Sequence, residues 1–464
     1  MEYRDQLTVV QAYRFALDPT PRQVRDLLRH AGAARFTYNW GLARIKANLA
    51  QRAAERSYGI AATDLTPPVN WSMYAMRKDW NQAKAHVAPW WVECSKEAYN
   101  TGLDQLARAL KNWSDSRKGE RKGSWVGFPR FESRRRHALS VRFTTGTIRL
   151  QDDRHHVRLP RLGRLKTHES TRKLHRRIAD GRARILSATV RAEAGRWFVS
   201  FTVEVQRTVR APARPDAVVG VDLGVKTLAV FSDARPEATN PNYDAARRKL
   251  ARSSRAVSRK RGPDLRTGQQ PSNRWRKANA ARNRVHHRVT AQRRDAIHKL
   301  TTALARQYGT IVVEHLNVAG MVKNRRLALA ISDAGFGEIR RQLAYKTGWN
   351  GGTLLVADRW YPSSKTCSGC GVVKTKLHLS ERVFTCTACG LVLDRDANAA
   401  RNLASLVKYV VAGSGPETGN GRGANSKTRP SRAGGHEAST PHRAALARIG
   451  RGPSPSNGRI TEIH

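Results

Sequence analysis

The sequence is poor in acidic residues, and it lacks long apolar runs. It contains only 36 Asp and Glu residues but 85 Lys and Arg residues, so the formal net charge is +49. Such a chain repels itself unless a polyanion binds it, and nucleic acid is the usual polyanion. A ribosomal-type structural protein or a merely basic soluble protein remains as the alternative. No run of about 18 apolar residues is present, which excludes a membrane-spanning helix of ordinary length. No basic segment carries the wide apolar face of a helix that lies on a membrane.

Cysteine is also scarce, with five in 464 residues. This number is too small for a disulfide scaffold. Residues 1–10 are polar and of mixed charge, unlike a secretory signal. We therefore expect a cytoplasmic, nucleoid-associated protein. Cys94 stands apart from the other four cysteines, and we expect it to be a small buried thiol.

The first half of the chain predicts a β domain with a helical block inserted in it. Alternation over Gln11–Leu17 predicts a first strand within residues 1–20, and Thr20-Pro21 predicts a helix start, with an interruption at Gly32. Residues 21–130 are mostly helical and rich in Trp and Arg, a mixture that suits base stacking but more often forms a core. Residues 131–210 alternate with period two and predict a small β-barrel, with a hairpin turn at Ala194-Gly195.

The second half follows a Pro- and Arg-rich linker at residues 210–215. Residues 216–362 predict an α/β core, with a strand hairpin over 217–232, a basic helical tract over 244–308 and a strand over 310–314. The stretch 412–464 contains few large apolar residues and predicts a basic disordered tail. This tail could contact RNA or be dispensable.

Two CxxC pairs give the strongest local signal. Their spacing, with fifteen residues between the pairs, matches a four-cysteine zinc ribbon over residues 363–392. Each pair is followed by a glycine, Gly371 or Gly390, which suits a tight turn. All four coordination positions would be filled by thiolates, so we predict one structural Zn²⁺, held by Cys367, Cys370, Cys386 and Cys389.

Three acids, far apart in sequence, predict a second metal site. Asp222 lies within an apolar strand, Glu314 ends another, and Asp396 begins a helix over residues 393–411. Two-metal phosphodiester hydrolysis needs hard oxygen ligands that converge from separate elements, so two Mg²⁺ ions are expected here. Taken singly, Glu314 could be a surface carboxylate and Asp396 a helix cap. A sugar-kinase or actin-like ATPase shares an early Asp-Leu-Gly, but the glycine-rich phosphate loops of that class are missing.

At this point the motifs resemble the TnpB family of transposon-encoded relatives of type V CRISPR effectors. The resemblance spans about residues 10–407 and rests on four stretches: GVDLGVKTLAVFSD, VVEHLNVAGM, AISDAGFGEIRRQLAYKTGWNGGTLLVADRWYPSSKTCSGCG and FTCTACGLVLDRDANAARNL. The motifs AYRFALDPTPRQ, RFTYNWGL and GFPRFESR are similar to the opening region of that family.

The resemblance implies a multidomain α+β protein. Its wedge β-barrel, interrupted by the helical recognition block, would be followed by an RNase H-like (RuvC) α/β domain with the inserted zinc ribbon. It implies a metal-dependent endodeoxyribonuclease that binds a guide RNA from the transposon end and double-stranded target DNA beside a short adjacent motif. Matched by motif, the catalytic acids are Asp222, Glu314 and Asp396, with Asp394 as the competitor of Asp396.

Four further positions in the matched motifs are predicted to contact nucleic acid: Tyr38, Asn39, Arg130 and Lys365. Two alternative functions stay open. One is a type V CRISPR-like effector, which differs in genomic neighbourhood rather than in chemistry. The other is a nucleic-acid-binding regulator or transposition accessory protein that does not cleave.

Overall fold

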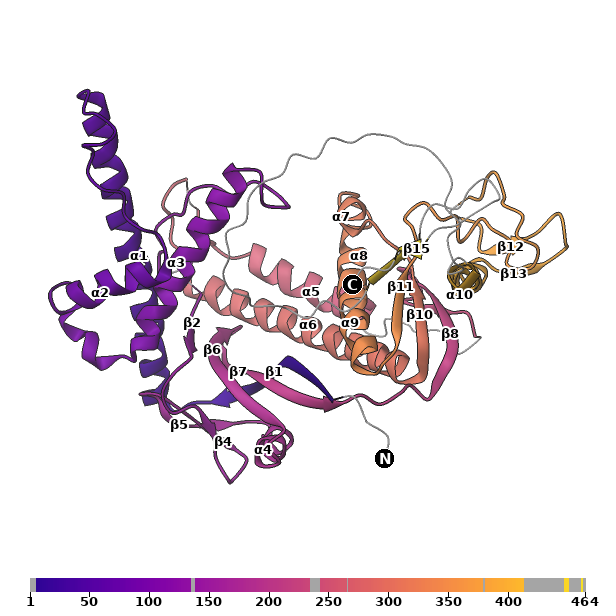
Figure 1. Cartoon of the computed structure of the whole chain (residues 1–464), viewed down its shortest axis with the longest axis horizontal. Coiled ribbons are helices and arrows are strands. Elements are labelled where there is room, and N and C mark those ends of the chain that lie inside the picture. The colour runs from indigo at the N-terminus through magenta and orange to yellow at the C-terminus, as the bar shows by residue number, and fades with distance from the viewer. Residues whose placement is uncertain are drawn as a thin grey trace. The chain divides into compact units, whose positions relative to one another are not determined.

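The computed structural model describes residues 6–134, 138–233, 243–264, 266–378, 380–412, 446–449 and 460–461. The chain forms two compact units. The first unit is Thr8–Arg207, and the second unit is Thr208–His464 together with Met1–Leu7. Figure 1 shows the elements of each unit, which are described separately below.

The first unit contains a helical block. Its helices are α1 (Pro21–Ser57), α2 (Met73–Val87), the 3-10 helix η1 (Pro89–Glu93) and α3 (Lys96–Arg117). Thr20 caps α1 in a reciprocal capping box with Gln23, as the Thr-Pro signal predicts. The predicted interruption at Gly32 is wrong, because α1 continues through it to Ser57. A helical glycine costs only about 1 kcal/mol relative to alanine, and α1 buries residues on both sides of Gly32.

Several aromatic residues of this block form its core, and others, such as Tyr58 and Tyr74, are exposed. Trp80 is buried, stacks on Tyr99 and meets Phe36 and Trp40 edge to face. Trp125 lies outside this core, with 75% of its surface exposed. The core interpretation of the Trp-rich pattern therefore holds for the central aromatics.

A seven-stranded sheet completes the first unit. Its strands are β1 (Gln6–Asp18), β2 (Ser140–Phe143), β3 (Arg149–Leu150), β4 (His156–Leu159), β5 (Gly163–Thr167), β6 (Ala183–Glu193) and β7 (Arg196–Thr208), and the short helix α4 (Arg172–Ala179) precedes β6. The strand order is β2-β6-β7-β1-β5-β4-β3. Because β1 lies between β7 and β5, the helical block is an insertion between β1 and the rest of the sheet. The predicted hairpin turn is present, with both Ala194 and Gly195 at positive φ.

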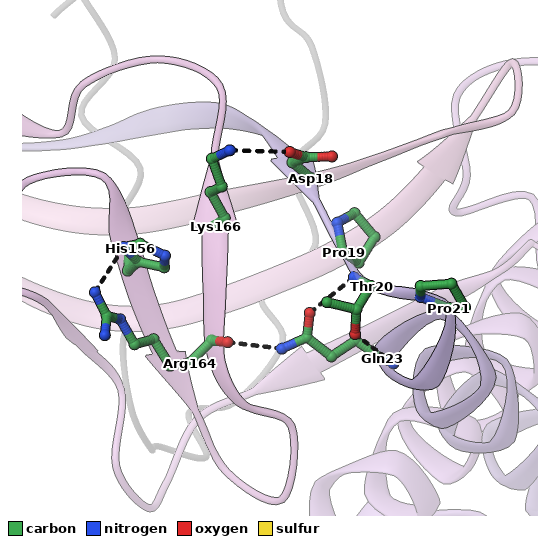
Figure 2. Close-up of a pocket in the computed structure, with 8 residues that line it drawn as sticks. All are labelled: Asp18, Pro19, Thr20, Pro21, Gln23, His156, Arg164 and Lys166. Atoms are coloured by element: carbon green, nitrogen blue, oxygen red, sulfur yellow. Dashed lines mark hydrogen bonds and ion pairs between the residues drawn. The ribbon is translucent and has the colours of Figure 1, made fainter.

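The start of α1 is tied to this sheet around a cavity of about 570 Å³ (Figure 2). The Gln23 side chain donates to the backbone carbonyl of Arg164, and Lys166 pairs with Asp18 at 3.4 Å. Arg164 in turn pairs with the carboxylate of Asp153. The cations that line this cavity thus have protein partners.

The second unit is built on a six-stranded sheet. Its strands are β8 (Arg214–Asp222), β9 (Val230–Phe231), β10 (Tyr308–Val313), β11 (Thr353–Val356), β14 (Leu446–Ile449) and β15 (Ile460–Thr461). The order is β15-β14-β11-β10-β8-β9, with β8, β10 and β11 parallel and β9 antiparallel to β8. Within the tail predicted to be disordered, two short segments instead form β14 and β15. The remainder of the tail lies outside the described residues.

Helices cover both faces of this sheet (Figure 1). The helices of this unit are α5 (Tyr243–Ser258), α6 (Asn273–Gln307), α7 (Val318–Met321), α8 (Ala328–Ala334), α9 (Phe336–Trp349) and α10 (Arg395–Ala412). Helix α5 packs on α6. One face packs on α6 and α9 through residues such as Ile297 and Leu343, and the opposite face packs on α10 through Leu403 and Leu406. The predicted basic tract is thus two helices, α5 and α6, with Gly262-Pro263 in the connection. No described helix is both long and apolar enough to cross a membrane.

Candidate active site and metal centre

The sheet register of the second unit brings two of the predicted acids together. Strands β8 and β10 pair in parallel, with Val221 opposite Val313. Asp222 and Glu314 are the next residues, so they lie side by side at the carboxyl ends of neighbouring strands.

Both acids also point to the same face of the sheet. Val221 and Val313 belong to the core on the α6 and α9 side. Successive side chains of a strand alternate between faces, so Asp222 and Glu314 project toward α10. The apolar strands on which they stand are buried on both faces, which explains why the sequence around each acid is rich in Val and Ile.

Helix α10 reaches this face because β8 carries a glycine. A Cβ atom at Gly220 would lie 1.9 Å from the carbonyl oxygen of Ala400 and 2.6 Å from the nitrogen of Ala404. Only glycine therefore permits this contact between the strand and the helix backbone. Asp396 lies one helical turn before Ala400, and Asp222 lies two residues beyond Gly220. The close contact thus sets the start of α10 over the two strand-end acids.

The structure separates the roles of Asp394 and Asp396. The Asp394 carboxylate accepts hydrogen bonds from the backbone N–H groups of Asp396 and Ala397 at 2.9 and 3.0 Å, so Asp394 caps α10. Its side chain is exposed. Asp396 follows in the first turn and interacts electrostatically with both Asp222 and Glu314, whereas Asp394 has a smaller interaction, with Asp222.

Burial and neighbouring negative charges raise the pKa values of the two strand-end carboxyl groups. Burial raises the pKa of Asp222 well above its ordinary range, and the charges of Glu314 and Asp396 raise it further. Burial likewise raises the pKa of Glu314, while the hydroxyl of Ser363 donates to its carboxylate and opposes the shift. Half-buried acids that repel one another favour a bound cation, which would relieve the repulsion.

Two arginines offset part of the negative charge of Asp396. Arg395 donates to Asp396 at 2.8 and 3.0 Å, and Arg382 lies 3.8 Å from the same carboxylate. Among the described residues, only the four cysteines form a group of three or more potential ligands whose atoms all lie within 4.8 Å of one another. The acids are thus neighbours that are spaced more widely, with Asp396 turned toward Arg395.

The four predicted zinc ligands converge. The Sγ atoms of Cys367 and Cys389 are 3.6 Å apart, and so are those of Cys370 and Cys386. A tetrahedral zinc site with Zn–S bonds of about 2.3 Å requires sulfur atoms about 3.8 Å apart. The thiol geometry therefore fits a bound metal ion of this kind.

The ribbon around these cysteines is a small hairpin, β12 (Val383–Thr385) paired with β13 (Val392–Asp394). Gly371 and Gly390 have φ values of 80° and 74°, the left-handed conformation that each CxxC turn requires. Backbone N–H groups of Cys389 and Ala388 lower the pKa of Cys386 to about 6. Hydrogen bonds with neighbouring thiols instead raise the pKa values of Cys370 and Cys389. In the metal-free cluster the turn therefore favours a thiolate at Cys386.

The four predicted nucleic-acid contacts lie in different surroundings, and all four stay predictions. Tyr38 is buried, and the Asn39 amide exchanges two hydrogen bonds with the backbone of Glu132, so both side chains serve the fold of the first unit. Lys365 is half-buried and donates to the carbonyl of Thr375. Arg130 is exposed and stays a predicted contact.

Sequence reasoning missed three polar side chains beside the acids: Ser363, Asn398 and Asn402. Ser363 contacts Glu314, and the two asparagines are buried on α10. Two asparagines four residues apart, within a helix that is otherwise rich in Ala and Leu, were the signal in the sequence.

Comparison with known proteins places the chain in a family. A family model described as "Probable transposase" matches residues 200–325, and one described as "Cas12f1-like, TNB domain" matches residues 336–403. A model described as "Helix-turn-helix domain" matches residues 9–53, which here form β1 and most of the single helix α1.

Similarity to curated proteins extends over nearly the whole chain. Several relatives have names beginning "Putative RNA-guided DNA endonuclease". The one from Mycobacterium tuberculosis H37Rv is 42% identical over 92% of this chain and 93% of its own length. Those from Streptomyces pristinaespiralis and Escherichia coli K12 are 34% and 30% identical, over 85% and 87% of this chain and 89% and 94% of their own lengths. The chain belongs to the TnpB family. The family resemblance noted from the motifs is thereby confirmed.

A solved structure of a Cas12f1–sgRNA–target DNA complex is similar to the chain at 12% identity, with a TM-score of 0.48, over 86% of this chain and 99% of that one. The family and the mixed helix and sheet content agree with the predicted multidomain α+β fold.

Proposed function

We propose that this TnpB-family protein is an RNA-guided DNA endonuclease with a single nuclease centre. The observation that carries this proposal is the position of Asp222 and Glu314, side by side at the ends of parallel strands and facing the start of α10. Asp396, whose charge acts on both acids, completes the set. The strand order, with β9 antiparallel and β10 parallel beside β8, is that expected of an RNase H-like (RuvC) domain.

The acid centre fits a pair of Mg²⁺ ions, since its ligands are hard carboxylate oxygens from separate elements. When bound, such ions activate water and stabilise the leaving oxygen in phosphodiester hydrolysis. Asp222 and Glu314 would supply oxygens from the sheet, and Asp396 would supply them from the helix. Arg395 has to release Asp396 for this purpose. Ser363 stabilises the charged form of Glu314, the form that binds a cation.

The cysteine cluster would hold one structural Zn²⁺. Its four thiols leave no ligand position open for water, so the site has no catalytic role of its own. The ribbon joins β11 to α10, and its metal would therefore fix the approach of the chain to Asp396. The first unit would correspond to a wedge β-barrel with its inserted recognition block. The described pairing runs from β2 to β3, and closure into a barrel remains a prediction.

The partners proposed are a guide RNA from the transposon end and double-stranded target DNA with a short adjacent motif. In guide-RNA effectors, base pairing reads the target sequence, and the protein contacts backbone and a short motif. A net charge of +49 suits a protein that holds both nucleic acids.

The test is to purify the chain with its co-expressed transposon-end RNA, sequence that RNA, and offer a matching DNA target with randomised flanks. Wild-type protein should cut the target in Mg²⁺. Asp222→Asn, Glu314→Gln and Asp396→Asn should bind RNA and target but cut at least about 100-fold more slowly, as expected when a metal ligand is lost.

Asp394→Asn is the matched control, because asparagine caps a helix as well as aspartate does. This variant should keep most of the cleavage. If Asp394→Asn loses cleavage and Asp396→Asn keeps it, Asp394 would be the catalytic acid and Asp396 would not. Wild-type protein that binds both nucleic acids without cutting would instead be a nucleic-acid-binding regulator.

A further inference from the structure

A short loop connects the acid centre to the cysteine cluster. It runs from Ser363 to Ser368 and contains the first cysteine, Cys367. At its beginning, Ser363 is only 4% exposed, and its Oγ donates to Oε1 of Glu314. The loop thus contacts an acid of the nuclease centre at one end and carries a predicted zinc ligand at the other.

Two buried amides of α10 hold this loop. Asn402 Nδ2 donates to the carbonyl oxygens of Ser363 and Thr366 at 2.7 and 2.6 Å. Asn398 Nδ2 donates to the same Thr366 oxygen at 2.7 Å, and Asn398 Oδ1 accepts from the N–H of Ser368 at 2.9 Å. The asparagines are 0% and 3% exposed and lie one helical turn apart, so they face the loop together.

This pattern requires a side chain with an amide group. The Ser363 and Thr366 carbonyls need donors, since a buried carbonyl without a partner is costly. The Ser368 N–H needs an acceptor, which the other half of the Asn398 amide provides. Aspartate has the same shape but only acceptors, and leucine has neither.

We propose that Asn398 and Asn402 are positioning residues of the nuclease centre, acting through the 363–368 loop to hold Ser363 against Glu314. This inference rests on the proposed nuclease function. Neither asparagine reaches Glu314 itself. Asn402 fixes the backbone of Ser363, and Ser363 fixes and stabilises the Glu314 carboxylate. Helix α10, which already carries Asp396, thereby also sets the second acid.

The experiment compares Asn402→Ala and Ser363→Ala with the wild-type chain. Ser405→Ala is the control, because the Ser405 hydroxyl is on the same helix and donates only to the Asn402 carbonyl within α10. Hydrogen exchange of the 363–368 amides reports on the loop, and titration with Mn²⁺ alone, followed by calorimetry, reports on the acid centre. Cleavage is then measured against Mg²⁺ concentration.

We expect Asn402→Ala and Ser363→Ala to differ in the hydrogen exchange of the loop amides and to show a similar loss of Mn²⁺ affinity. Asn402→Ala should exchange the loop amides faster and weaken Mn²⁺ binding about 10- to 100-fold, the usual effect of losing a residue that orients a metal ligand. Ser363→Ala should weaken Mn²⁺ binding similarly while its loop exchanges at the wild-type rate. Ser405→Ala should match the wild type in both measurements.

If the loop amides of Asn402→Ala exchange at the wild-type rate and the variant binds Mn²⁺ with wild-type affinity, the positioning role is overturned. If that variant does not fold, wild-type Mn²⁺ affinity in Ser363→Ala would overturn it equally. A wild-type chain that neither binds Mn²⁺ nor cuts DNA would refute the nuclease function itself. If the wild-type chain binds Mn²⁺ and cuts DNA, variants with wild-type loop exchange and Mn²⁺ affinity would refute only the inference about the asparagines.

Discussion

The contact between Gly220 and α10 gives a prediction with a magnitude. In Gly220→Ala, the new methyl group would lie 1.9 Å from the Ala400 carbonyl oxygen, whereas an ordinary contact begins near 3.4 Å. Since the opposing atoms are helix backbone, no side chain can rotate away. The helix must therefore move by about 1.5 Å, or the strand must bend, and overpacking of this kind costs about 1–3 kcal/mol of the free energy of unfolding.

The same movement would carry Asp396 away from Asp222 and Glu314. A misplacement of about 1 Å at a catalytic group can lower the rate about 100-fold. We therefore expect Gly220→Ala to cut a guide-matched target at least about 100-fold more slowly than the wild type, with a lower melting temperature and unchanged guide-RNA binding. Cleavage would be measured in single turnover with the purified ribonucleoprotein.

Gly337→Ala provides the control. Gly337 lies within α9 of the same unit, and a Cβ atom there would meet nothing within 4 Å. Alanine should be neutral or stabilise the helix by about 0.5–1 kcal/mol at such a position. Wild-type cleavage and melting in Gly220→Ala would show that α10 does not rest on β8, and the geometry proposed for the three acids would fall with it.

Three other predictions concern charge and metal. Because burial raises the pKa values of Asp222 and Glu314, the folded state holds protons that the unfolded state releases, so metal-free protein should lose stability as the pH rises above about 4. Asp222→Asn should reduce this loss of stability, and its melting temperature at pH 7 in EDTA should exceed that of the wild type. A higher melting temperature for the wild type under these conditions would contradict the raised pKa of Asp222. Cys386→Ser should lower both the zinc content by elemental analysis and the melting temperature; unchanged zinc would exclude the ribbon. Binding of guide RNA should weaken steeply between 50 and 200 mM salt, and a flat dependence would argue against extensive phosphate contacts.

Much of the local structure could be predicted because it depends on neighbours in the sequence. The CxxC spacing identified the cysteine cluster, and Thr20-Pro21 identified the start of α1. Alternation with period two identified the β6–β7 hairpin with its turn at Ala194-Gly195. Gly32 shows the limit of such signals, since helix packing outweighed a local preference.

The surroundings of single side chains were harder to predict. Tyr38 and Asn39 stand in a motif of the recognition block, yet one is buried and the other binds a neighbouring backbone segment. A tyrosine or asparagine has the same chemistry in a core and on a nucleic-acid surface. Which one it serves depends on elements that lie far away in the sequence.

The sequence by itself determined the family and supplied the three candidate acids and the four candidate thiols, because ligand chemistry and spacing are properties of the chain. Only the tertiary structure revealed that Asp394 caps α10, while Asp396 lies in the first turn, pairs with Arg395 and acts electrostatically on Asp222 and Glu314. It alone revealed that Asn398 and Asn402 hold the loop that contacts Glu314. The physical reason is that strand register, the face on which a side chain lies and the approach of a helix arise from packing between distant segments.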